Sequence, residues 1–323
     1  MVRFSCLASL VQTRRAALRA GYGIALGGLS LGALGAFAAC SGAPVDAAGE
    51  TSQAAEARLA DIEARLGGRV GVHVIDVASG RAFGRRADER FAMCSTFKWL
   101  AALFALREAP DRDAVVPYTM DDLVPYAPVT KPALDGARAL SLRDLAEAAV
   151  VLSDNPAANL LLRGLGGPEG FTARLRVAGD DATRLDRWEV DLNENLDGDP
   201  RDTTTPAAMA ALVRKLLFEA PSAATPEAET VRDWMIASPT GARRVRGGLP
   251  EGWRVGDKTG TSNNGATNVV GFAYPPAASA PVIFAAYLDP RGAAIADAEA
   301  AHREIGAILA ARFGEWSVDG SAL

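Results

Sequence analysis

Residues 93–98 read Met93-Cys94-Ser95-Thr96-Phe97-Lys98 and lead directly into the apolar run 97–104. A segment that is apolar on nearly every side predicts a helix buried at the centre of a domain. Ser95 and Lys98 would share one face of that helix, because residues three apart are neighbours. A serine hydroxyl needs such a nearby base to become a nucleophile. The Ser-x-x-Lys spacing alone occurs about once by chance in a chain of this length, so the surrounding sequence decides its meaning.

Strand patterns lie toward both ends of the chain, and helix patterns lie between them. The expected strands are 70–77, 81–85, 253–258, 268–274 and 282–287. The expected helices include 54–66, 141–152 and 155–165, with a last one running from an N-cap at Asp297 to Phe313. This order predicts an α/β fold: a discontinuous α/β domain, with an antiparallel sheet flanked by helices from both chain ends, and an all-α domain. We assign residues 54–86 and 236–323 to the α/β domain, and 87–235, with a long polar loop at 186–204, to the all-α domain.

The first 40 residues have the pattern of an export signal. Arg14 and Arg15 precede an uncharged run, 20–39, that ends in small residues, as in a signal peptide of the twin-arginine type. We therefore expect a signal peptide over 1–40, a linker over 41–53, and an exported, periplasmic or extracellular protein. The alternative is an uncleaved membrane anchor, because about 20 apolar residues can span a bilayer.

Cys40 ends the segment Phe37-Ala38-Ala39-Cys40, which resembles a lipobox. In that case Cys40 is lipidated and anchors a lipoprotein to the membrane. Cleavage at Ala36-Phe37-Ala38 by ordinary signal peptidase is the competing expectation.

The composition disfavours several functional classes. There are 34 basic and 39 acidic residues, a net charge of −5 that becomes more negative when the signal is removed, so no nucleic-acid partner is expected. With only His73 and His302 present, a Ser-His-Asp triad and a histidine-rich zinc site are both disfavoured. Cys94 is the one cysteine of the globular part, so no disulfide is expected within it.

Four short motifs occur in order along the chain: Ser95-x-x-Lys98, Ser153-Asp154-Asn155, Arg187-Trp188-Glu189 and Lys258-Thr259-Gly260. Each tripeptide has only about a 4% chance of occurring somewhere in such a chain. S-x-x-K, S-D-N and K-T-G together are the signature of class A β-lactamases and penicillin-binding proteins. From about Glu56 onward the chain resembles the class A β-lactamases, including residues 89–91 (Glu-Arg-Phe) and 154–161 (Asp-Asn-Pro-Ala-Ala-Asn-Leu-Leu).

The resemblance implies hydrolysis of the β-lactam amide of penicillins and cephalosporins, which confers antibiotic resistance and requires no cofactor or metal. Ser95 is then the nucleophile, and the backbone N–H groups of Ser95 and Thr261 form the oxyanion hole. Ser153 passes a proton to the lactam nitrogen. Either Lys98, or Glu189 acting through a water, is the base in acylation.

Glu189 distinguishes a hydrolase from a transpeptidase in this resemblance. It would activate the water that hydrolyses the acyl-enzyme, with Asn193 as a second ligand of that water. The surrounding residues match the omega loop of the family, which an ion pair between Arg187 and Asp202 would clamp. Without such a base, the chain would be a D,D-peptidase or a β-lactam-binding sensor that is acylated once and does not turn over.

Further residues are expected to bind the substrate, a small-molecule β-lactam, in a monomeric protein. Asn155 would hold the side-chain amide, and Tyr126 would form a wall of the cleft. The residues expected around the substrate carboxylate are Lys258, Thr259, Gly260, Thr261 and Arg244.

The chain departs from the family at three places. Val190 stands where proline is common, Thr267 where many relatives carry an arginine, and Ser262 where the disulfide partner of Cys94 would lie. Plainer interpretations also exist: Ser153-Asp154-Asn155 as a helix cap, Lys258 as a solvated strand residue, and Glu189 and Arg244 as surface charges.

Overall fold

A five-stranded antiparallel sheet forms the middle of the computed structural model, which describes residues 51–290 and 292–314. The strand order is β2-β1-β7-β6-β5. The strands are β1 (Arg69–Asp76), β2 (Ala82–Arg85), β5 (Arg254–Thr261), β6 (Thr267–Tyr274) and β7 (Val282–Asp289). The late strand β7 therefore lies between the early strand β1 and β6, which confirms the antiparallel sheet built from both ends of the chain.

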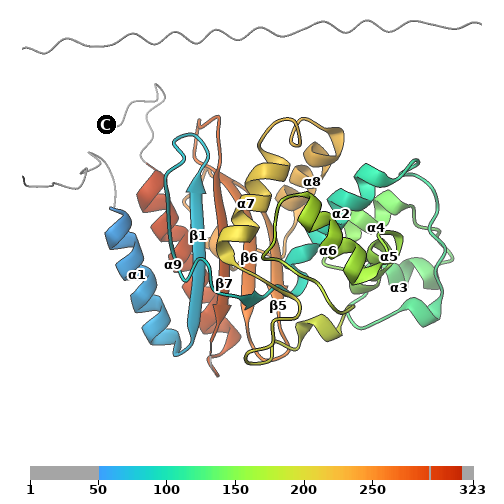
Figure 1. The fold of residues 1–323 in the computed structure, drawn as a ribbon, viewed down its shortest axis with the longest axis horizontal. Coiled ribbons are helices and arrows are strands. Elements are labelled where there is room, and N and C mark those ends of the chain that lie inside the picture. The colour runs from blue at the N-terminus through green and yellow to red at the C-terminus, as the bar shows by residue number, and fades with distance from the viewer. Residues whose placement is uncertain (1–50, 291, 315–323) are drawn as a thin grey trace, which may run out of the picture. The chain divides into compact units, whose positions relative to one another are not determined.

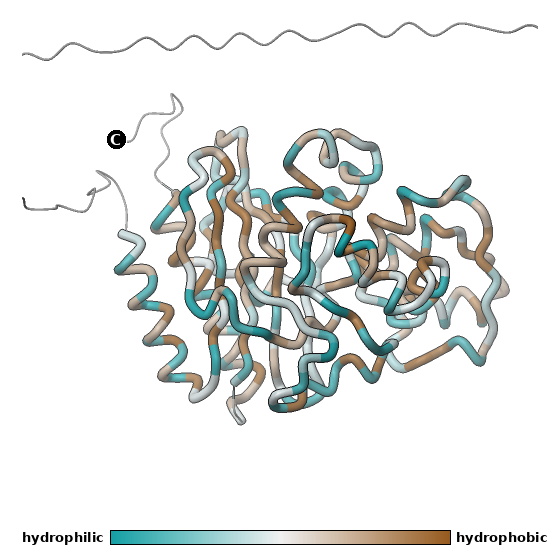
Figure 2. The backbone as a smooth tube through the Cα atoms, viewed as in Figure 1, coloured by the Kyte–Doolittle hydropathy of each residue, from teal (hydrophilic) through white to brown (hydrophobic). Residues whose placement is uncertain are grey.

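Strand β7 is buried along its whole length, because both faces of the sheet are covered. Ile283, Ala285 and Tyr287 contribute to one hydrophobic cluster, and Phe284 and Ala286 contribute to another. This alternation follows from the two-residue period of a strand. Figure 2 shows the hydrophobic stretches that run along the central strands.

Two helices from opposite ends of the chain cover one face of the sheet (Figure 1). These are α1 (Ser52–Leu66), which begins inside the predicted linker, and α9 (Ile295–Phe313). The prediction of Asp297 as the N-cap of α9 is wrong: Ala294 occupies that position, without a side-chain cap. Asp297 lies instead in the first turn, where a carboxylate is also favourable.

Glu63 ties α1 to the sheet. Its carboxylate accepts hydrogen bonds from Val70 N at 3.0 Å and Arg86 Nε at 2.5 Å, and it also pairs with Arg85. Burial alone would raise the pKa of Glu63, but the hydrogen bonds from Arg86, Arg85 and Val70 outweigh it and lower this pKa to about 2.

The other face of the sheet carries the helical part of the molecule. Its helices are α2 (Lys98–Glu108), α3 (Thr130–Asp135), α4 (Leu142–Val151), α5 (Asn155–Gly164), α6 (Gly167–Val177), α7 (Pro206–Leu217) and α8 (Pro226–Ala237). Residues 98–106 of α2 are all buried, which confirms the buried central helix. The boundaries assigned to the two domains stay a prediction.

Short elements connect these helices. The 3-10 helices are η1 (Cys94–Phe97), η2 (Met120–Asp122), η3 (Asp191–Asn193) and η4 (Val245–Gly248). A two-stranded ladder, β3 (Phe91–Ala92) with β4 (Thr203–Thr204), also lies within the region expected to be all-α. This ladder brings the start of η1 next to the end of the 186–204 loop.

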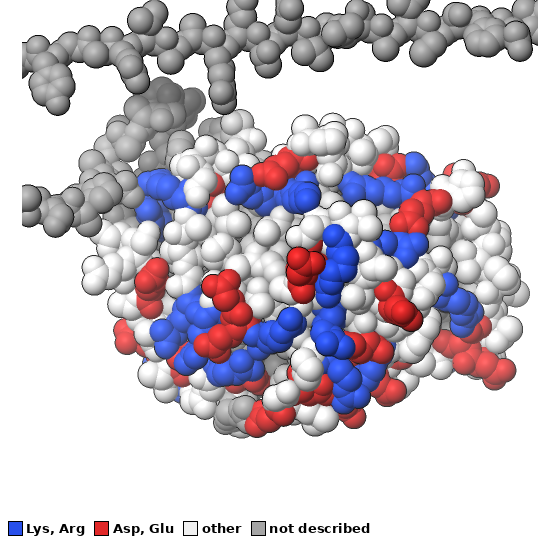
Figure 3. Space-filling view, viewed as in Figure 1, with Lys and Arg blue, Asp and Glu red and all other residues white. Residues whose placement is uncertain are grey.

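The predicted signal peptide 1–40, with Cys40, lies outside the described residues. Within the described part of the chain, no helix is both long enough and apolar enough to cross a membrane. Basic and acidic side chains are interspersed on the face shown in Figure 3 rather than gathered by sign.

Candidate active site

A cleft of about 650 Å³ opens at the junction of η1, the edge strand β5 and the 186–204 loop. Many of the residues expected from the sequence line it: Ser95, Tyr126, Ser153, Asn155, Asn193, Arg244, Thr259, Gly260 and Thr261. The side chains of Lys98, Glu189 and Lys258 are buried close to this lining. The interpretations of Lys258 as a solvated residue, and of Glu189 and Arg244 as surface charges, are therefore wrong.

Ser95 and Lys98 meet at one carboxylate oxygen. Ser95 Oγ donates a hydrogen bond to Glu189 Oε1 at 3.2 Å, and Lys98 Nζ lies 3.0 Å from the same oxygen. Ser95 lies in η1 and Lys98 begins α2, so the two residues straddle the change from a 3-10 to an α-helix. The hydroxyl, the amine and the carboxylate thus form a connected group through which a proton can move.

Lys98 is completely buried and fixed by polar partners. Its Nζ donates to Ser153 O at 2.9 Å and to Asn155 Oδ1. Burial lowers the pKa of Lys98, and the opposing effects of the charge and hydrogen bond of Glu189 only partly offset it. A lysine whose pKa is lowered gives up and takes back a proton more readily, which an arginine cannot do.

Ser153 lines the cleft beside Lys258 of β5. Lys258 Nζ donates to Ser153 Oγ and to Thr259 O, at 2.9 and 2.8 Å. Burial and the positive charges of Lys98 and Arg244 lower the pKa of Lys258 well below its usual range. The neighbouring Asp154 does cap helix α5, through a hydrogen bond from Ala157 N at 2.9 Å. The motif therefore combines a helix cap with two cleft residues.

Glu189 is held from two sides. Asn193 Nδ2 donates to Glu189 Oε2 at 2.6 Å, so this carboxylate oxygen is fixed while the other faces Ser95. Asn159 of α5 hydrogen-bonds both backbone groups of Glu189. The peptide bond between Glu189 and Val190 is cis. Asn159 was part of the matched sequence, but only the folded chain reveals what it contacts.

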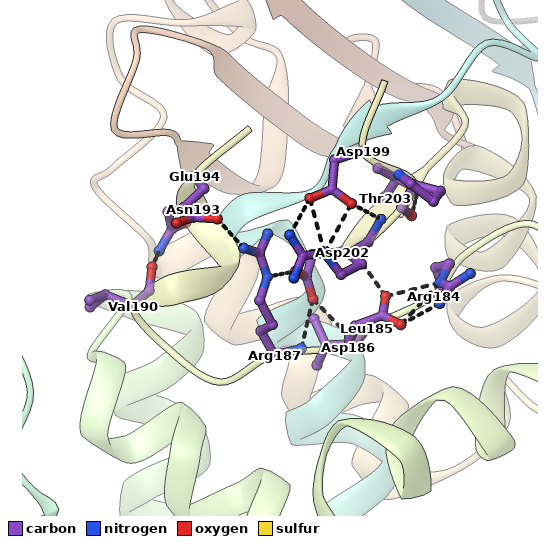
Figure 4. Close-up of polar contacts among 12 residues, drawn as sticks. Arg184, Leu185, Asp186, Arg187, Val190, Asn193, Glu194, Asp199, Asp202 and Thr203 are labelled. Carbon is purple, nitrogen blue, oxygen red and sulfur yellow. Dashed lines mark hydrogen bonds and ion pairs between the residues drawn. The ribbon is translucent and has the colours of Figure 1, made fainter. Parts of the chain in front are cut away.

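The loop that carries Glu189 is closed by buried charges (Figure 4). Arg187 Nε lies 2.6 Å from Asp202 Oδ2, and Arg187 also pairs with Glu194. Asp202 Oδ1 accepts from the backbone N of Asp186 at 2.7 Å and of Arg187 at 2.9 Å. These bonds join the two ends of the loop close to β4.

Strand β5 approaches Ser95 closely because Gly260 has no side chain. A Cβ on Gly260 would lie 2.8 Å from Met93 O and 3.2 Å from Ser95 N. This contact brings the strand that carries Thr261 next to the backbone N–H of Ser95. A pair of converging N–H groups is what an oxyanion hole requires.

Arg244 is buried at the same end of the cleft. Its guanidinium donates to Gly260 O at 2.6 Å, to Thr261 Oγ1 at 2.7 Å and to Asn268 O. Burial lowers the pKa of Arg244 to about 10. These hydrogen bonds to β5 and to the neighbouring strand β6 place a positive charge beside Thr261, where a substrate carboxylate can be bound.

Thr259 connects to a chain of hydroxyl groups that the sequence did not indicate. Its Oγ1 donates to Thr240 Oγ1 at 2.9 Å, and Thr240 lies 3.0 Å from Ser238 Oγ. Ser238 Oγ donates to Val151 O, the carbonyl that ends α4, at 3.1 Å. The chain joins β5 to the segment that precedes Ser153.

Comparison with known proteins identifies the family. The model of the β-lactamase enzyme family matches residues 54–313. The chain is 48% identical over 246 residues to β-lactamase AST-1 of Nocardia asteroides, which covers 75% of this chain and 78% of that protein. This chain belongs to the class A β-lactamases.

Other relatives and solved structures agree. β-Lactamase FAR-1 of Nocardia farcinica is 47% identical over 224 residues, 68% of this chain and 71% of that protein. An ancestral class A β-lactamase matches with a TM-score of 0.76 and 46% identity, over 79% of this chain and 98% of that chain. The structure of PenP from Rhodopseudomonas palustris, described as a putative class A β-lactamase, also matches. Its TM-score is 0.75 and its identity 44%, over 80% of this chain and 98% of that chain.

Of the three departures of this class A β-lactamase from its family, Val190 follows the cis peptide bond, and Ser262 and Thr267 make contacts of their own. Cys94 is a free, buried thiol whose pKa is raised by burial. Ser262 accepts from Ala266 N at 2.9 Å and donates to Asn264 at 2.6 Å, so it stabilises the turn between β5 and β6. Thr267 is buried, and its Oγ1 lies 3.1 Å from Nε2 of His302. Among residues 51–290 and 292–314 there is no cluster of side chains suited to hold a metal ion.

Tyr126 is 60% exposed at the edge of the cleft of this β-lactamase. Its backbone has a φ of +66°, and its carbonyl accepts from Asn155 N at 3.0 Å. Asn155 Nδ2 donates to the neighbouring carbonyl of Pro125 at 2.8 Å. These bonds fix the segment that presents the aromatic ring.

Proposed function

We propose that this class A β-lactamase hydrolyses the β-lactam amide of penicillins and cephalosporins through an acyl-enzyme on Ser95. The observation that carries the proposal is the convergence of Ser95 and Lys98 on Glu189, a carboxylate fixed by its own loop. This arrangement supplies a base for both halves of the reaction at the same nucleophile.

In acylation, Ser95 Oγ attacks the lactam carbonyl and its proton passes to the Lys98–Glu189 pair. The oxygen that becomes negative accepts hydrogen bonds from the N–H groups of Ser95 and Thr261. When the C–N bond breaks, the nitrogen takes a proton from Ser153, and Ser153 recovers one from the Lys98–Glu189 pair. Lys258, 2.9 Å away, stabilises the changing charge on Ser153. The product is an ester of Ser95.

In deacylation, Glu189 removes a proton from water as that water attacks the ester carbonyl. Asn193 holds the second oxygen of Glu189 and can also bind the water. The ester bond then breaks and Ser95 recovers its proton. The substrate carboxylate is bound by Arg244, Thr259 and Thr261. Its side-chain amide is bound by Asn155, and Tyr126 forms a wall of the cleft.

The variant Glu189→Ala tests the proposal. We expect it to accumulate acyl-enzyme on benzylpenicillin, seen by mass spectrometry as a mass increase equal to the intact drug. Asp191→Asn, an exposed acid of the same loop, is the matched control and should turn over normally. Normal steady-state turnover by Glu189→Ala would contradict the mechanism.

The wild-type protein separates the two rival functions. Cleavage of a D-Ala-D-Ala peptide without turnover of penicillin would indicate a D,D-peptidase. A wild-type acyl-enzyme that persists would indicate a β-lactam sensor.

We also propose that the protein is exported as a monomer, with lipidation at Cys40. The motif Arg14-Arg15 and the segment 37–40 support this. Replacement of Arg14 and Arg15 by lysine should leave β-lactamase activity in the cytoplasm. Cys40→Ala should release activity from the membrane fraction, and size-exclusion chromatography should give the monomer mass. Activity that remains in the membrane fraction of Cys40→Ala would contradict lipidation.

A further inference from the structure

A second guanidinium lies beside the carboxylate end of the cleft, and this inference about its role rests on the proposed function. Arg243 precedes the buried Arg244 and lines the same cleft. Its Nε lies 3.1 Å from Glu299 Oε2, a residue of α9 that also lines the cleft. Neither Arg243 nor Glu299 belongs to the motifs that predicted the site.

The two members of this ion pair differ sharply in exposure. The Arg243 side chain is 78% exposed, whereas that of Glu299 is 13% exposed. The cation therefore faces the open side of the cleft and the carboxylate lies behind it. The backbone that carries Arg243 is anchored, because Arg243 O accepts from Arg303 Nη1 at 3.2 Å and Arg244 N donates to Gly241 O at 2.9 Å.

The charges at this end of the cleft do not cancel. Glu299 and Asp257 both interact electrostatically with Arg244. Glu299 also pairs with Arg243 and Asp257 also pairs with Arg246, so two carboxylates face three guanidiniums. When Arg244 binds the substrate carboxylate, the exposed Arg243 still has donors available. Because the Arg243 side chain is largely exposed, its pairing with Glu299 is weak, so Glu299 can share Arg243 with a second anion.

The chemistry of cephalosporins indicates which anion this is. In a cephalosporin the C3 carbon, which carries a variable substituent, is bonded to the C4 carbon that carries the carboxylate. With the carboxylate at Arg244 and Thr261, the C3 substituent lies at the same end of the cleft, which Arg243 and Glu299 also line. Penicillins have no corresponding substituent.

We propose that Arg243 binds an acidic group on the C3 substituent of a cephalosporin, and so favours substrates that are dianions. The interaction forms on binding, before any bond of the lactam breaks. Its effect therefore falls mainly on KM rather than on kcat.

Cefamandole and cefonicid test this proposal. They share the mandelamido side chain and the tetrazolylthiomethyl group at C3, and cefonicid differs only in carrying a sulfonate there. The measured quantity is kcat/KM for cefonicid divided by kcat/KM for cefamandole. Because both drugs share the same reacting groups, this ratio measures how much the added negative charge changes kcat/KM.

We expect Arg243→Ala to lower the ratio about threefold to fivefold, which is the effect of an exposed charge pair. Arg243→Glu should lower it further, and Glu299→Gln should raise it. Added salt should shrink the ratio in the wild type and not in Arg243→Ala, because exposed charges are screened. Benzylpenicillin kcat/KM should stay within about twofold in Arg243→Ala.

If Arg243 had a purely structural role, its replacement would change kcat/KM for both cephalosporins equally. The ratio would then stay constant, and that result would overturn the proposal. If neither cephalosporin turns over, their inhibition constants against benzylpenicillin hydrolysis give the same ratio. Failure of the proposed function is distinct, because benzylpenicillin itself would then not be hydrolysed.

Discussion

Asn159 encloses the backbone of Glu189: its Nδ2 donates to Glu189 O at 2.9 Å and its Oδ1 accepts from Glu189 N at 3.0 Å. One side chain on a rigid helix thus fixes both polar groups of the residue proposed as the water base. The loop that carries Glu189 is consequently positioned from α5, as well as by its own ion pairs.

Asn159→Ala should slow deacylation more than acylation. Two hydrogen bonds of about 1 kcal/mol each are lost, and a small displacement of a base lowers the rate steeply, so we expect at least about a tenfold loss in deacylation. Single-turnover kinetics with benzylpenicillin separate the two steps. Asn159→Asp, which can still accept from Glu189 N, should be intermediate. An equal loss in both steps would contradict a specific effect on Glu189.

Gly260→Ala should lower the rate of acylation by at least about tenfold. The added Cβ would meet Met93 O at 2.8 Å and Ser95 N at 3.2 Å, and so would push β5 away from η1. The two N–H groups of the proposed oxyanion hole would separate, and loss of one such donor costs about 100-fold or more in kcat. Gly164→Ala is the matched control, because a Cβ there meets nothing within 4 Å. The acylation rate, measured by stopped flow, should fall only in Gly260→Ala.

Arg187→Ala should destabilise the fold by about 3 kcal/mol, because it leaves the fully buried carboxylate of Asp202 without its partner. Arg201→Ala removes a more exposed pair with Asp199 from the same loop and should cost less than about 1 kcal/mol. Urea denaturation of both variants measures the difference. Equal losses would show that burial of the Arg187–Asp202 pair is not what matters.

Glu63→Gln should lower stability at pH 7 by about 1–2 kcal/mol, a value reduced for partial solvent exposure. The pKa of Glu63 is about 2 in the folded state and near 4.5 in the unfolded state. The stabilisation is therefore complete above about pH 4.5 and is lost as the pH falls toward 2. Chemical denaturation from pH 7 to pH 3 should show the two proteins converging. Glu56→Gln, at an exposed position of α1, should show no such convergence.

Three of the four motifs lie on or next to regular elements, and the fourth, Arg187-Trp188-Glu189, lies in the 186–204 loop. Ser95 precedes α2, Ser153 precedes α5, and Lys258 lies in an edge strand, so sequence patterns could place all three. Strand β5 runs on through Thr261, beyond the predicted end at Lys258, because the polar residues 259–261 still pair with β6. The apolar pattern that predicts strands does not extend over such residues.

The contacts that sequence patterns could not predict join segments distant in the chain. Asn159 meets Glu189, Thr240 meets Thr259, and Arg243 meets Glu299. Each pair depends on how loops pack after the sheet and helices are in place. Neither helical nor strand periodicity carries that information.

The place of β7 between β1 and β6 has a consequence for biosynthesis. β1 ends at Asp76, whereas its partner β7 begins at Val282, so a growing chain exposes one unpaired edge of the β1–β2 hairpin until almost the whole protein has left the ribosome. Contacts between such distant segments form slowly, and an exposed strand edge invites pairing with other chains. We expect ribosome-bound chains that stop before β7 to be protease-sensitive. The nascent protein is thus a natural client for a chaperone that shields strand edges until synthesis is complete.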